Sequence, residues 1–315
     1  MRWILCGKGG AVIQALEHAC AQGDEVWAIG ASGDDGHDDW QPSYKAAAAR
    51  IGVRFEQPRR INDPAFTERL AEFGADALIS IQYDQILRAP LFERIGCPCL
   101  NLHFALLPRH RGVAPIAWAI TEGDAEAGVT LHHMVPAIDA GDVIAQRRVP
   151  IAPDENARSL YDRVSDAAAA LFRESHPFPP DLLARRLEQS EAGACYHRNG
   201  DFDFSRRTVD WGRPALALQR WLRAMIFPPL QQPEVVLDGR RLAILAVGSD
   251  VAPATDAAPG TIVRVRDGGV DVAAADGILH LPRLEALDAD AGSTVALVEG
   301  ARFDAPHGEN EENAP

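Results

Sequence analysis

Short apolar runs that alternate with amphipathic helical patterns dominate the first hundred residues of this 315-residue chain. Four of the runs are expected to be β-strands, at residues 3–6, 26–29, 75–80 and 98–102. Helical patterns lie at residues 10–19, 44–51, 63–73, 90–95 and, further on, 157–172. Strands that alternate with helices indicate a parallel sheet covered on both faces, whose ligands bind beyond the carboxyl ends of the strands. The sequence therefore predicts a Rossmann-like α/β domain with a parallel sheet.

The second half of the chain has a different rhythm. A helical pattern at 214–225 precedes five short apolar runs, which lie at residues 235–237, 242–247, 261–265, 270–273 and 278–281. Runs of this length, separated by Gly, Pro and Asp, are typical of a small β-barrel, here of the OB-like kind. We expect an α/β domain at 1–190, a linker at 191–205, a helix-plus-barrel domain at 206–305 and a disordered acidic tail at 306–315.

Composition limits what the chain can bind. The formal net charge of -14 disfavours a polyanion such as tRNA or DNA as the main partner, because phosphate binding depends on Lys and Arg. No apolar run approaches the length of a membrane span, so no membrane contact is expected. The five cysteines are odd in number and scattered, which indicates reduced thiols in a cytoplasmic protein. Cys97 and Cys99 are close together, but no second Cys/His pair has zinc-site spacing, so no bound metal is expected.

An amide, an imidazole and a carboxylate stand where the pattern predicts strand ends or loops: Asn101, His103 and Asp139. Acyl transfer to an amine requires a donor for the oxyanion, a base for the amine proton and a carboxylate that orients the base. Asn101 and His103 are two residues apart, so their side chains would point to the same face of a strand. Taken alone, an Asn-x-His pair occurs by chance, and an Asp-x-Gly turn is usually only a turn.

Two other motifs have plainer interpretations. Gly7-Lys-Gly9-Gly10 resembles part of a dinucleotide-binding fingerprint but lacks its full spacing, so we interpret it as a tight turn from strand to helix. His132 and His133 are adjacent and would face opposite sides of a strand, so they cannot easily share a metal. We interpret these two histidines as packing or substrate contacts.

Three separated segments together resemble the signature of the folate-dependent formyltransferase family. They are Asn101-Leu-His103, Leu106-Leu-Pro-Arg-His-Arg-Gly112 and Asp139-Ala-Gly141, in the family's order and at family-like spacing. Ala105 departs from the pattern, since the family usually has Ser there. Segments from 259 to 281 resemble the barrel domain that follows in some members. The resemblance implies an N-formyltransferase in which Asn101, His103 and Asp139 are catalytic.

The resemblance also implies a co-substrate and its contacts. The formyl donor of the family is 10-formyltetrahydrofolate, whose pterin is held largely by backbone groups of two segments. The residues expected there are Gln82, Tyr83, Ile86, Leu87, Val135, Ile138 and Asp139. For an acceptor that carries a diphosphate and a base, arginines would bind the phosphates and aromatic rings would stack on the base. The residues expected to contact the acceptor are Arg109, Arg111, Gly112, Arg223, Phe227 and Trp221.

Two acceptors compete within this resemblance. The segment 128–135 looks similar to formyltransferases of nucleotide-linked amino sugars, whereas the length and two-domain plan also fit methionyl-tRNA formyltransferase. The tRNA enzyme is expected to have a basic insertion after the second strand. Here residues 33–39 contain four acids and no Lys or Arg, which would repel an acceptor stem.

We therefore expect transfer to a nucleotide-linked amino sugar, with tRNA formylation as the alternative. Two further alternatives are hydrolysis of 10-formyltetrahydrofolate and a non-catalytic folate-binding module. The resemblance is compatible with a homodimer. Because an amine attacks only as the free base, we expect the rate to rise with pH until the imidazole and the amine are both deprotonated.

Overall fold

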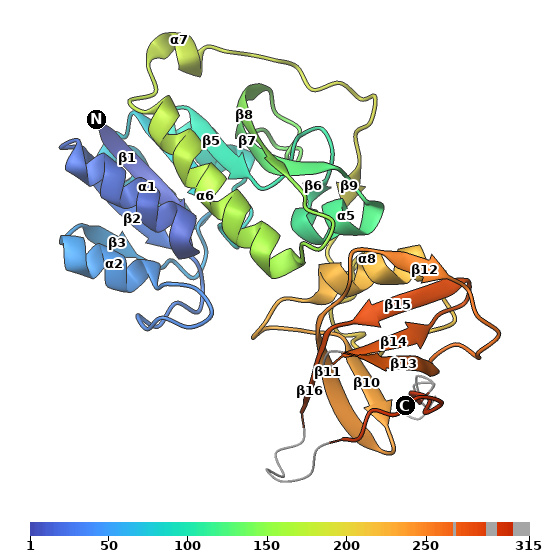
Figure 1. The fold of residues 1–315 in the computed structure, drawn as a ribbon. Helices are drawn as coiled ribbons and strands as arrows, with labels where there is room; N and C mark the ends of the chain where they lie inside the picture. The colour runs from blue at the N-terminus through green and yellow to red at the C-terminus, as the bar shows by residue number, and fades with distance from the viewer. Residues whose placement is uncertain (267–268, 288–294, 305–315) are drawn as a thin grey trace, which may run out of the picture. The chain divides into compact units, whose positions relative to one another are not determined.

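The structure is a computed structural model that describes residues 1–266, 269–287 and 295–304 (Figure 1). Contacts divide the chain into two compact units. The first comprises residues 1–115, 126–150 and 161–199, and the second comprises residues 116–125, 151–160 and the described residues from 200 onward. The segments 116–125 and 151–160 thus belong to the second unit, although both lie inside the predicted first domain. The predicted domain boundaries remain a proposal, and the predicted disordered tail at 306–315 lies outside the described residues.

A seven-stranded sheet forms the centre of the first unit. Its strands are β1 (Arg2–Gly7), β2 (Glu25–Gly30), β3 (Arg54–Glu56), β4 (Ala77–Ile81), β5 (Cys99–His103), β7 (Glu126–His133) and β8 (Val143–Pro150), in the spatial order β3-β2-β1-β4-β5-β7-β8. β1 to β5 are parallel, as predicted. β7 pairs antiparallel with both β5 and β8, so the Rossmann-like sheet continues beyond its parallel part with two antiparallel strands. The connection between β7 and β8 is only nine residues long, shorter than the crossover of roughly a dozen residues that a parallel pair requires.

Three strands of this sheet, β3, β7 and β8, have no counterpart among the predicted apolar runs, and two of them, β3 and β8, are edge strands. β3 has three residues, of which two are charged, and its burial is only partial. β8 lies at the opposite edge of the sheet and has the exposed sequence Arg147-Arg148 in its second half. Edge strands bury less of their surface than central strands, so a search for continuous apolar runs does not detect them.

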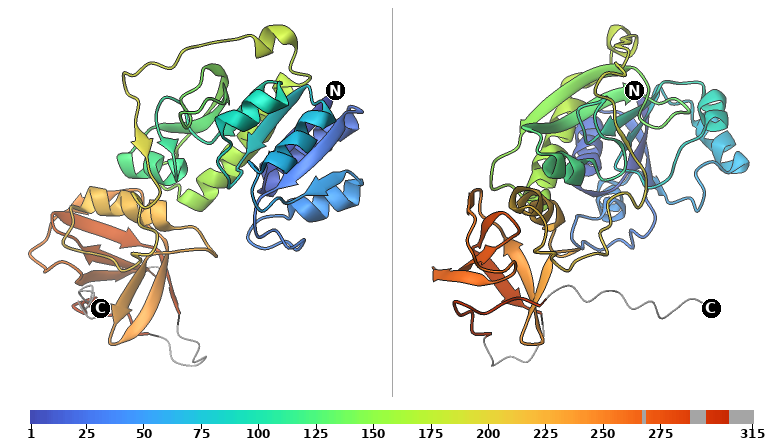
Figure 2. Two further views of the ribbon diagram at one scale, coloured as in Figure 1. Left: turned by 180° about the vertical axis from the view of Figure 1, so that it is seen from behind. Right: turned by 90° about the vertical axis from the view of Figure 1, so that its right-hand side faces the viewer.

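Helices cover both faces of the sheet (Figures 1 and 2). α1 (Gly9–Ala21), α2 (Tyr44–Ile51) and α6 (Ala157–Ser175) lie on one face, and α3 (Pro64–Phe73) and α4 (Ala89–Ile95) lie on the other. Alternate residues of β1 pack on the two layers. Trp3 meets Phe172 of α6 edge to face, whereas Ile4 belongs to a buried cluster with Leu70 of α3 and Leu91 of α4. The two remaining helices outside the C-terminal region are α5 (Pro115–Glu122) and α7 (Pro180–Leu183).

The glycine-rich segment after β1 is a tight turn, as interpreted from the sequence. β1 ends at Gly7 and α1 begins at Gly9, whose φ angle is +72°. A Cβ atom on Gly7 would lie 2.2 Å from the carbonyl oxygen of Ile81, so no larger residue fits between β1 and β4. The glycines at this place allow the close approach of two neighbouring strands.

The part of the second unit from residue 200 onward contains a helix and two antiparallel sheets within the described residues. The helix is α8 (Ala215–Met225), and the strands are β10 (Glu234–Leu237), β11 (Arg240–Ala246), β12 (Val251–Pro253), β13 (Ile262–Arg266), β14 (Gly269–Ala273), β15 (Gly277–Leu281) and β16 (Arg283–Ala286). The sheets have the orders β10-β11-β16 and β12-β15-β14-β13, and one apolar cluster joins both of them to α8. The predicted strand-rich domain is confirmed, although its strands are grouped in two sheets.

One short parallel pair lies apart from the large sheet. β6 (Arg111–Gly112) pairs with β9 (Tyr196–His197), which joins the loop after β5 to a segment near the end of the first unit. Among the described residues, no helix is long and apolar enough to span a membrane.

Candidate active site

The last strand of the parallel part of the sheet presents the predicted amide and imidazole. Asn101 and His103 lie on β5, which pairs with β4 so that Asn101 is opposite Ser80. Because side chains alternate along a strand, Asn101 and His103 face the same side while Leu100 and Leu102 are fully buried or nearly so. The predicted pair therefore stands at the carboxyl end of β5.

Asp139 reaches this place from a turn between β7 and β8. Its φ angle of +54° lies in the left-handed region, and the Gln189 side chain holds the turn by donating to the carbonyl oxygens of Asp139 and Gly141, at 2.8 and 2.7 Å. A Cβ atom on Gly141 would lie 1.9 Å from the carbonyl oxygen of His133. The glycine of the Asp-x-Gly motif is thus required by the close approach of the turn to the end of β7.

The structure brings the three predicted side chains together. Asn101 Nδ2 donates to Asp139 Oδ1 at 3.4 Å, and His103 Nδ1 lies 3.6 Å from Asp139 Oδ2. The backbone N–H of Gly112 donates to Asp139 Oδ2 at 2.8 Å. The carboxylate thus lies between the amide and the imidazole, in contact with the Leu-Leu-Pro loop (106–112).

The hydrogen bonds of His103 define which of its nitrogens is basic. His103 Nε2 lies 2.8 Å from the carbonyl oxygen of His110, and a carbonyl oxygen can only accept a hydrogen bond. Nε2 therefore has the proton, and Nδ1 of the neutral ring has the free lone pair. Nδ1 is also the nitrogen that faces Asp139, so a proton taken up there would form an ion pair with the carboxylate.

His132 is part of the same hydrogen-bond network. Its Nδ1 donates to the carbonyl oxygen of His133 at 2.9 Å, which leaves Nε2 as an acceptor for Asn101 Nδ2 at 3.2 Å. The sequence interpretation of packing or substrate contact did not include this role. The antiparallel register of β5 and β7, which places His132 opposite Asn101, is the cause of the contact and has no signal in the local sequence. His133 points away to the carbonyl oxygen of Arg185, at 3.2 Å.

The charges of the site follow from burial and hydrogen bonding. Burial lowers the pKa of His103, against the opposing effects of the Asp139 charge and the His110 carbonyl. Burial alone would raise the pKa of Asp139, but His103, His132 and the Gly112 amide outweigh it and hold this pKa well below its usual range. The resting site therefore combines an ionised carboxylate with a neutral imidazole, which is the protonation state of a general base.

The first of the two segments expected to bind the folate packs on an apolar cluster, which the residue before the second segment also contacts. Tyr83 and Leu87 from the first segment pack on this cluster together with Met134, which precedes the second segment. Val135 and Ile138 expose 39% and 38% of their surface. Exposed apolar side chains of this kind can contact a flat, partly apolar ring.

The fit of the co-substrate is supported by a polar atom in the first segment. The Tyr83 hydroxyl is buried and has no hydrogen-bond partner within the described part of the chain. Burial also raises the pKa of Tyr83, so the hydroxyl keeps its proton and can donate. Gln82 has a left-handed φ angle of +57°, and Ile86 is 62% exposed. A ring with several acceptor atoms would satisfy the buried hydroxyl, as the pterin of 10-formyltetrahydrofolate can.

The residues expected to contact the acceptor lie in different surroundings. Arg109 and Arg111 lie in the Leu-Leu-Pro loop, and Arg111 Nε donates to Gln189 Oε1 at 3.0 Å. The Gly112 amide is already engaged by Asp139. These three contacts with the acceptor remain predictions.

The other three expected contacts belong to the second unit. Arg223 is only 7% exposed and donates to the carbonyl oxygens of Ala152 and Glu155, each at 3.3 Å. These bonds and the burial of Arg223 describe a structural role and do not favour the predicted phosphate contact. Trp221 lines a surface pocket together with Arg213, whose guanidinium lies 5.7 Å from the Trp221 ring, and Phe227 lies 5.5 Å from the guanidinium of Arg158. Their contact with the substrate remains a prediction.

The α/β unit holds an amide, an imidazole and a carboxylate at its strand ends, and a strand-rich unit follows it. This combination defines a group-transfer enzyme of the acyl-transfer kind. The chain belongs to the formyl transferase family: the model of the formyl transferase domain matches residues 8–175, and that of its C-terminal domain matches residues 205–302. This confirms the resemblance found in the sequence.

Curated relatives and solved structures agree with this assignment. Methionyl-tRNA formyltransferase of Myxococcus xanthus is 36% identical over 247 residues, which cover 78% of this chain and 76% of that protein. The N-formyltransferase of Helicobacter canadensis, solved in a complex with folinic acid and dTDP-3-aminofucose, has a TM-score of 0.74 at 20% identity and covers 90% of this chain and 99% of its own. WlaRD, a sugar 3N-formyltransferase solved in the presence of dTDP and 5-N-formyl-THF, has a TM-score of 0.71 at 20% identity, with coverages of 91% and 98%.

The expected activity and co-substrate are therefore confirmed at the level of the family. The chain is a formyl-transferring enzyme, and the formyl donor of its family is 10-formyltetrahydrofolate. The sequence relatives and the structural neighbours differ in the acceptor that their names state.

Proposed function

We propose that this enzyme transfers the formyl group to the amino group of a nucleotide-linked amino sugar. The observation that carries the proposal is the acidic loop at residues 31–43, which follows β2 and lies at the same carboxyl edge of the sheet as Asn101 and His103. A loop in this position would meet an acceptor as it enters the site. Its charge therefore selects among acceptors.

Contacts with two neighbouring elements hold the acidic loop beside the site. The backbone N–H of Ser32 donates to Asp84 Oδ2 at 2.8 Å, which joins the loop to the segment expected to bind folate. Trp40 lies 5.7 Å, ring to ring, from Tyr161, and Tyr161 lies 5.7 Å from Phe104, the residue after His103. The loop is thus connected on one side to the predicted pterin segment and on the other to the catalytic strand.

The acids of this loop are part of its structure. Asp34 accepts hydrogen bonds from the Gly36 N–H, the Ser43 hydroxyl and the Lys45 N–H, at 3.1, 2.6 and 2.9 Å. Asp38 accepts from the Ser43 N–H at 2.8 Å. These hydrogen bonds hold the two carboxylates in fixed positions within the loop.

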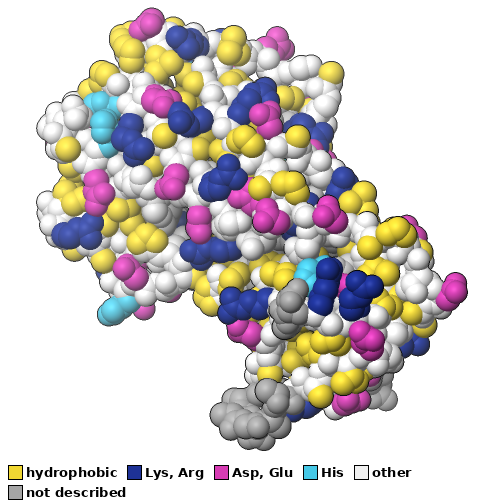
Figure 3. All heavy atoms as spheres, viewed as in Figure 1, with side chains coloured by type: hydrophobic (Ala, Val, Ile, Leu, Met, Phe, Trp, Pro, Cys, Tyr) yellow, Lys and Arg dark blue, Asp and Glu magenta, His cyan; other side chains and the backbone are white. Residues whose placement is uncertain are grey.

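This negative charge disfavours a nucleic acid as the acceptor. A tRNA presents many phosphates and depends on basic side chains that track them, whereas a nucleoside diphosphate needs only one or two cations. On the face shown in Figure 3, Lys and Arg side chains are interspersed with Asp and Glu side chains. The acceptors named for the Helicobacter canadensis enzyme and for WlaRD support the same choice.

The chemistry follows from the geometry of the triad. The neutral amine of the acceptor attacks the formyl carbon, and the carbonyl oxygen becomes negative. This oxygen accepts a hydrogen bond from Asn101 Nδ2, which gives up its 3.4 Å hydrogen bond to Asp139. His103 Nδ1 takes the amine proton, and Asp139 stabilises the imidazolium. The bond from the formyl carbon to the folate nitrogen then breaks, and the proton passes from His103 to that nitrogen. One C–N bond forms and one breaks, and no redox partner is needed.

Formylation of methionyl-tRNA is the second candidate. It is favoured by the 36% identity to the methionyl-tRNA formyltransferase of Myxococcus xanthus, which exceeds the 20% identity to either of the sugar formyltransferases above. Release of formate to water would make the chain a hydrolase of the same co-substrate.

One assay separates these functions. The enzyme is incubated with 10-formyltetrahydrofolate labelled at the formyl carbon, in parallel with a set of nucleotide-linked amino sugars, with methionyl-tRNA or with buffer alone. Mass spectrometry then follows the label. Label on an amino sugar supports the proposal, label on tRNA supports the second candidate, and free formate in buffer supports hydrolysis. Full retention of the label on folate in every arm contradicts all three.

The cellular location and the oligomeric state are part of the proposal as well. We propose a cytoplasmic location, since the five cysteines are free thiols in the structure, and a homodimer, as the resemblance allows. Fractionation of cells and sedimentation of the purified enzyme test these two expectations.

A further inference from the structure

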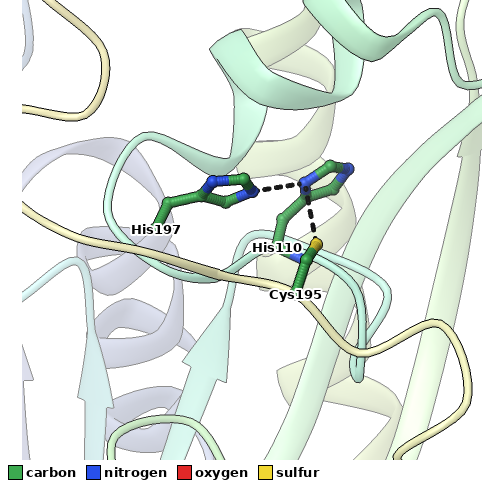
Figure 4. A group of neighbouring side chains, drawn as sticks. All are labelled: His110, Cys195 and His197. Atoms are coloured by element: carbon green, nitrogen blue, oxygen red, sulfur yellow. Dashed lines mark hydrogen bonds between the residues drawn. The ribbon is translucent and has the colours of Figure 1, made fainter.

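Three potential metal ligands from distant parts of the first unit converge beside the Leu-Leu-Pro loop. They are His110, Cys195 and His197, and Figure 4 shows their side chains turned toward one another. His110 and Cys195 are 85 residues apart in the chain, so the spacing argument that predicted no metal could not detect them. His110 and His197 are buried, at 3% and 8% exposure, and Cys195 is half-buried.

The distances between the ligand atoms match those around a bound metal ion. His110 Nδ1 lies 3.0 Å from His197 Nε2 and 3.6 Å from Cys195 Sγ, and all three atoms lie within 4.8 Å of one another. Around a tetrahedral zinc ion, with bonds of about 2.0–2.1 Å to nitrogen and about 2.3 Å to sulfur, the nitrogens would be ~3.3 Å apart and nitrogen and sulfur ~3.6 Å apart. Two of the three separations are therefore close to those around zinc, and the third, between Cys195 Sγ and His197 Nε2, lies within 4.8 Å.

The geometry at His110 Nδ1 favours a cation over a set of hydrogen bonds. Both the Cys195 thiol and the His197 ring approach this single nitrogen, which has either one lone pair or one proton in the ring plane (Figure 4). A hydrogen-bonded arrangement satisfies only one of these two contacts at a time. A metal ion between the three atoms would take one lone pair from each of them.

The surrounding backbone supports a metal-bound thiolate. The N–H of His110 donates to Cys195 Sγ at 3.0 Å, a hydrogen bond that stabilises negative charge on sulfur. The ligands are also held in place by the pairing of β6 with β9: Arg111 N–H donates to the Cys195 carbonyl oxygen and Val113 N–H to the His197 carbonyl oxygen, both at 3.0 Å. The site is thus formed by the backbone before any metal binds.

We propose that His110, Cys195 and His197 bind a zinc ion that ties the segment 195–197 to the Leu-Leu-Pro loop. Thiolate and imidazole ligands together select borderline-soft cations, among which zinc has no preference for another geometry. Three protein ligands leave the fourth position to water, which the half-buried Cys195 allows. The bound ion would hold the carbonyl oxygen of His110 toward His103 Nε2, and the Gly112 amide toward Asp139.

The first test is the metal content of the purified enzyme. Elemental analysis is expected to find about one zinc per chain in the wild type and in Cys20→Ala, a matched change at another half-buried cysteine. In Cys195→Ser and in His197→Ala the zinc content should fall by about tenfold or more, because each loses a ligand. Wild-type protein that contains no zinc and takes up none from solution contradicts the proposal. So does undiminished zinc in both ligand variants, or copper or iron in place of zinc.

A second measurement keeps the proposal testable if a ligand variant fails to fold. The wild type is stripped with a chelator and reloaded with Co²⁺, whose bond to a thiolate gives a charge-transfer absorption band. The band should appear with one equivalent of Co²⁺ and should be unchanged in Cys20→Ala. Stripping should also lower the melting temperature of the wild type, and zinc should restore it. Absence of the thiolate band, or a melting temperature that neither the chelator nor zinc alters, overturns the assignment.

Discussion

His103 donates from Nε2 to the carbonyl oxygen of His110 over 2.8 Å. This bond fixes the tautomer of the ring, because a carbonyl oxygen cannot donate, and it turns Nδ1 toward Asp139. The loop that supplies the carbonyl also supplies the Gly112 amide that holds Asp139. One loop thus orients both the base and the carboxylate through its backbone.

Removal of the base should reduce turnover with little effect on folding. His103→Ala is expected to lower kcat by about 10²–10⁴-fold, the usual contribution of a general base. His18→Ala is the control, since His18 lies in the last turn of α1, outside the site and the acidic loop. Steady-state kinetics and thermal melting measure the two effects. Near-normal turnover of His103→Ala would exclude this histidine as the base.

The charge of Asp139 should matter more than its shape. Asp139→Asn keeps an acceptor for the Gly112 amide but loses the ion pair with protonated His103, so kcat should fall by about 10²–10⁴-fold. The melting temperature should fall as well, because a carboxyl pKa depressed in the folded state means that the charge stabilises the fold. Asp142→Asn, at a partly exposed carboxylate that pairs at 3.9 Å with Arg186, is the matched control. Equal turnover of the two variants would contradict the role of Asp139.

Gly112 is expected to tolerate no side chain. Its φ angle is +91°, and a Cβ atom would lie 2.2 Å from the carbonyl oxygen of His197. Gly112→Ala should lower the free energy of unfolding by about 3 kcal/mol or more, from backbone strain plus the clash. Gly193→Ala is the control, since its φ is +79° but its Cβ would meet nothing within 4 Å, so it should lose only about 1 kcal/mol. Urea unfolding measures the change in both variants. Similar losses of unfolding free energy in the two would contradict the predicted clash.

Asp24 should make stability depend on pH. Its side chain is 6% exposed, and the Trp3 indole nitrogen and His176 Nε2 each lie 2.6 Å from its Oδ2. Burial would raise the pKa of this carboxyl, but the hydrogen bonds from the amino terminus, His176 and Trp3 outweigh burial and hold the pKa below its ordinary value.

A depressed carboxyl pKa stabilises the fold at high pH. The contribution of Asp24 should be complete above about pH 5 and should be lost as the pH falls through the unfolded pKa near 4 to the lower folded value. Asp24→Asn should lower the free energy of unfolding by about 2 kcal/mol at pH 7. The variant should also lose less of its unfolding free energy than the wild type as the pH falls. Urea unfolding from pH 7 to pH 3 measures this, with the exposed Glu93→Gln as control. An Asp24→Asn profile parallel to the wild type would contradict the prediction.

The sequence predicted those features that depend on local pattern. The alternation of apolar runs and helices gave the α/β unit, and the two-residue spacing placed Asn101 and His103 on one face of β5. The family resemblance added Asp139, which no local pattern joins to His103. The short edge strand β3 was not predicted, because its sequence Arg-Phe-Glu has no apolar run.

Features that depend on pairing between distant segments could not be predicted in this way. His132 entered the network because β7 runs antiparallel to β5, in a register that only the folded sheet defines. The cluster of His110, Cys195 and His197 depends on the pairing of β6 with β9, two strands of two residues each. Strands this short have no periodicity to detect.

The central claim is that the Asn101, His103 and Asp139 site formylates a small nucleotide-linked amine. Its most direct test is a competition, in which the wild-type enzyme and labelled 10-formyltetrahydrofolate are given a nucleotide-linked amino sugar and methionyl-tRNA at equal concentration. Mass spectrometry of both acceptors measures where the label goes. The account predicts label on the sugar amine, with this product lost in His103→Ala. Label on the tRNA, or sugar labelling that persists in His103→Ala, would contradict it.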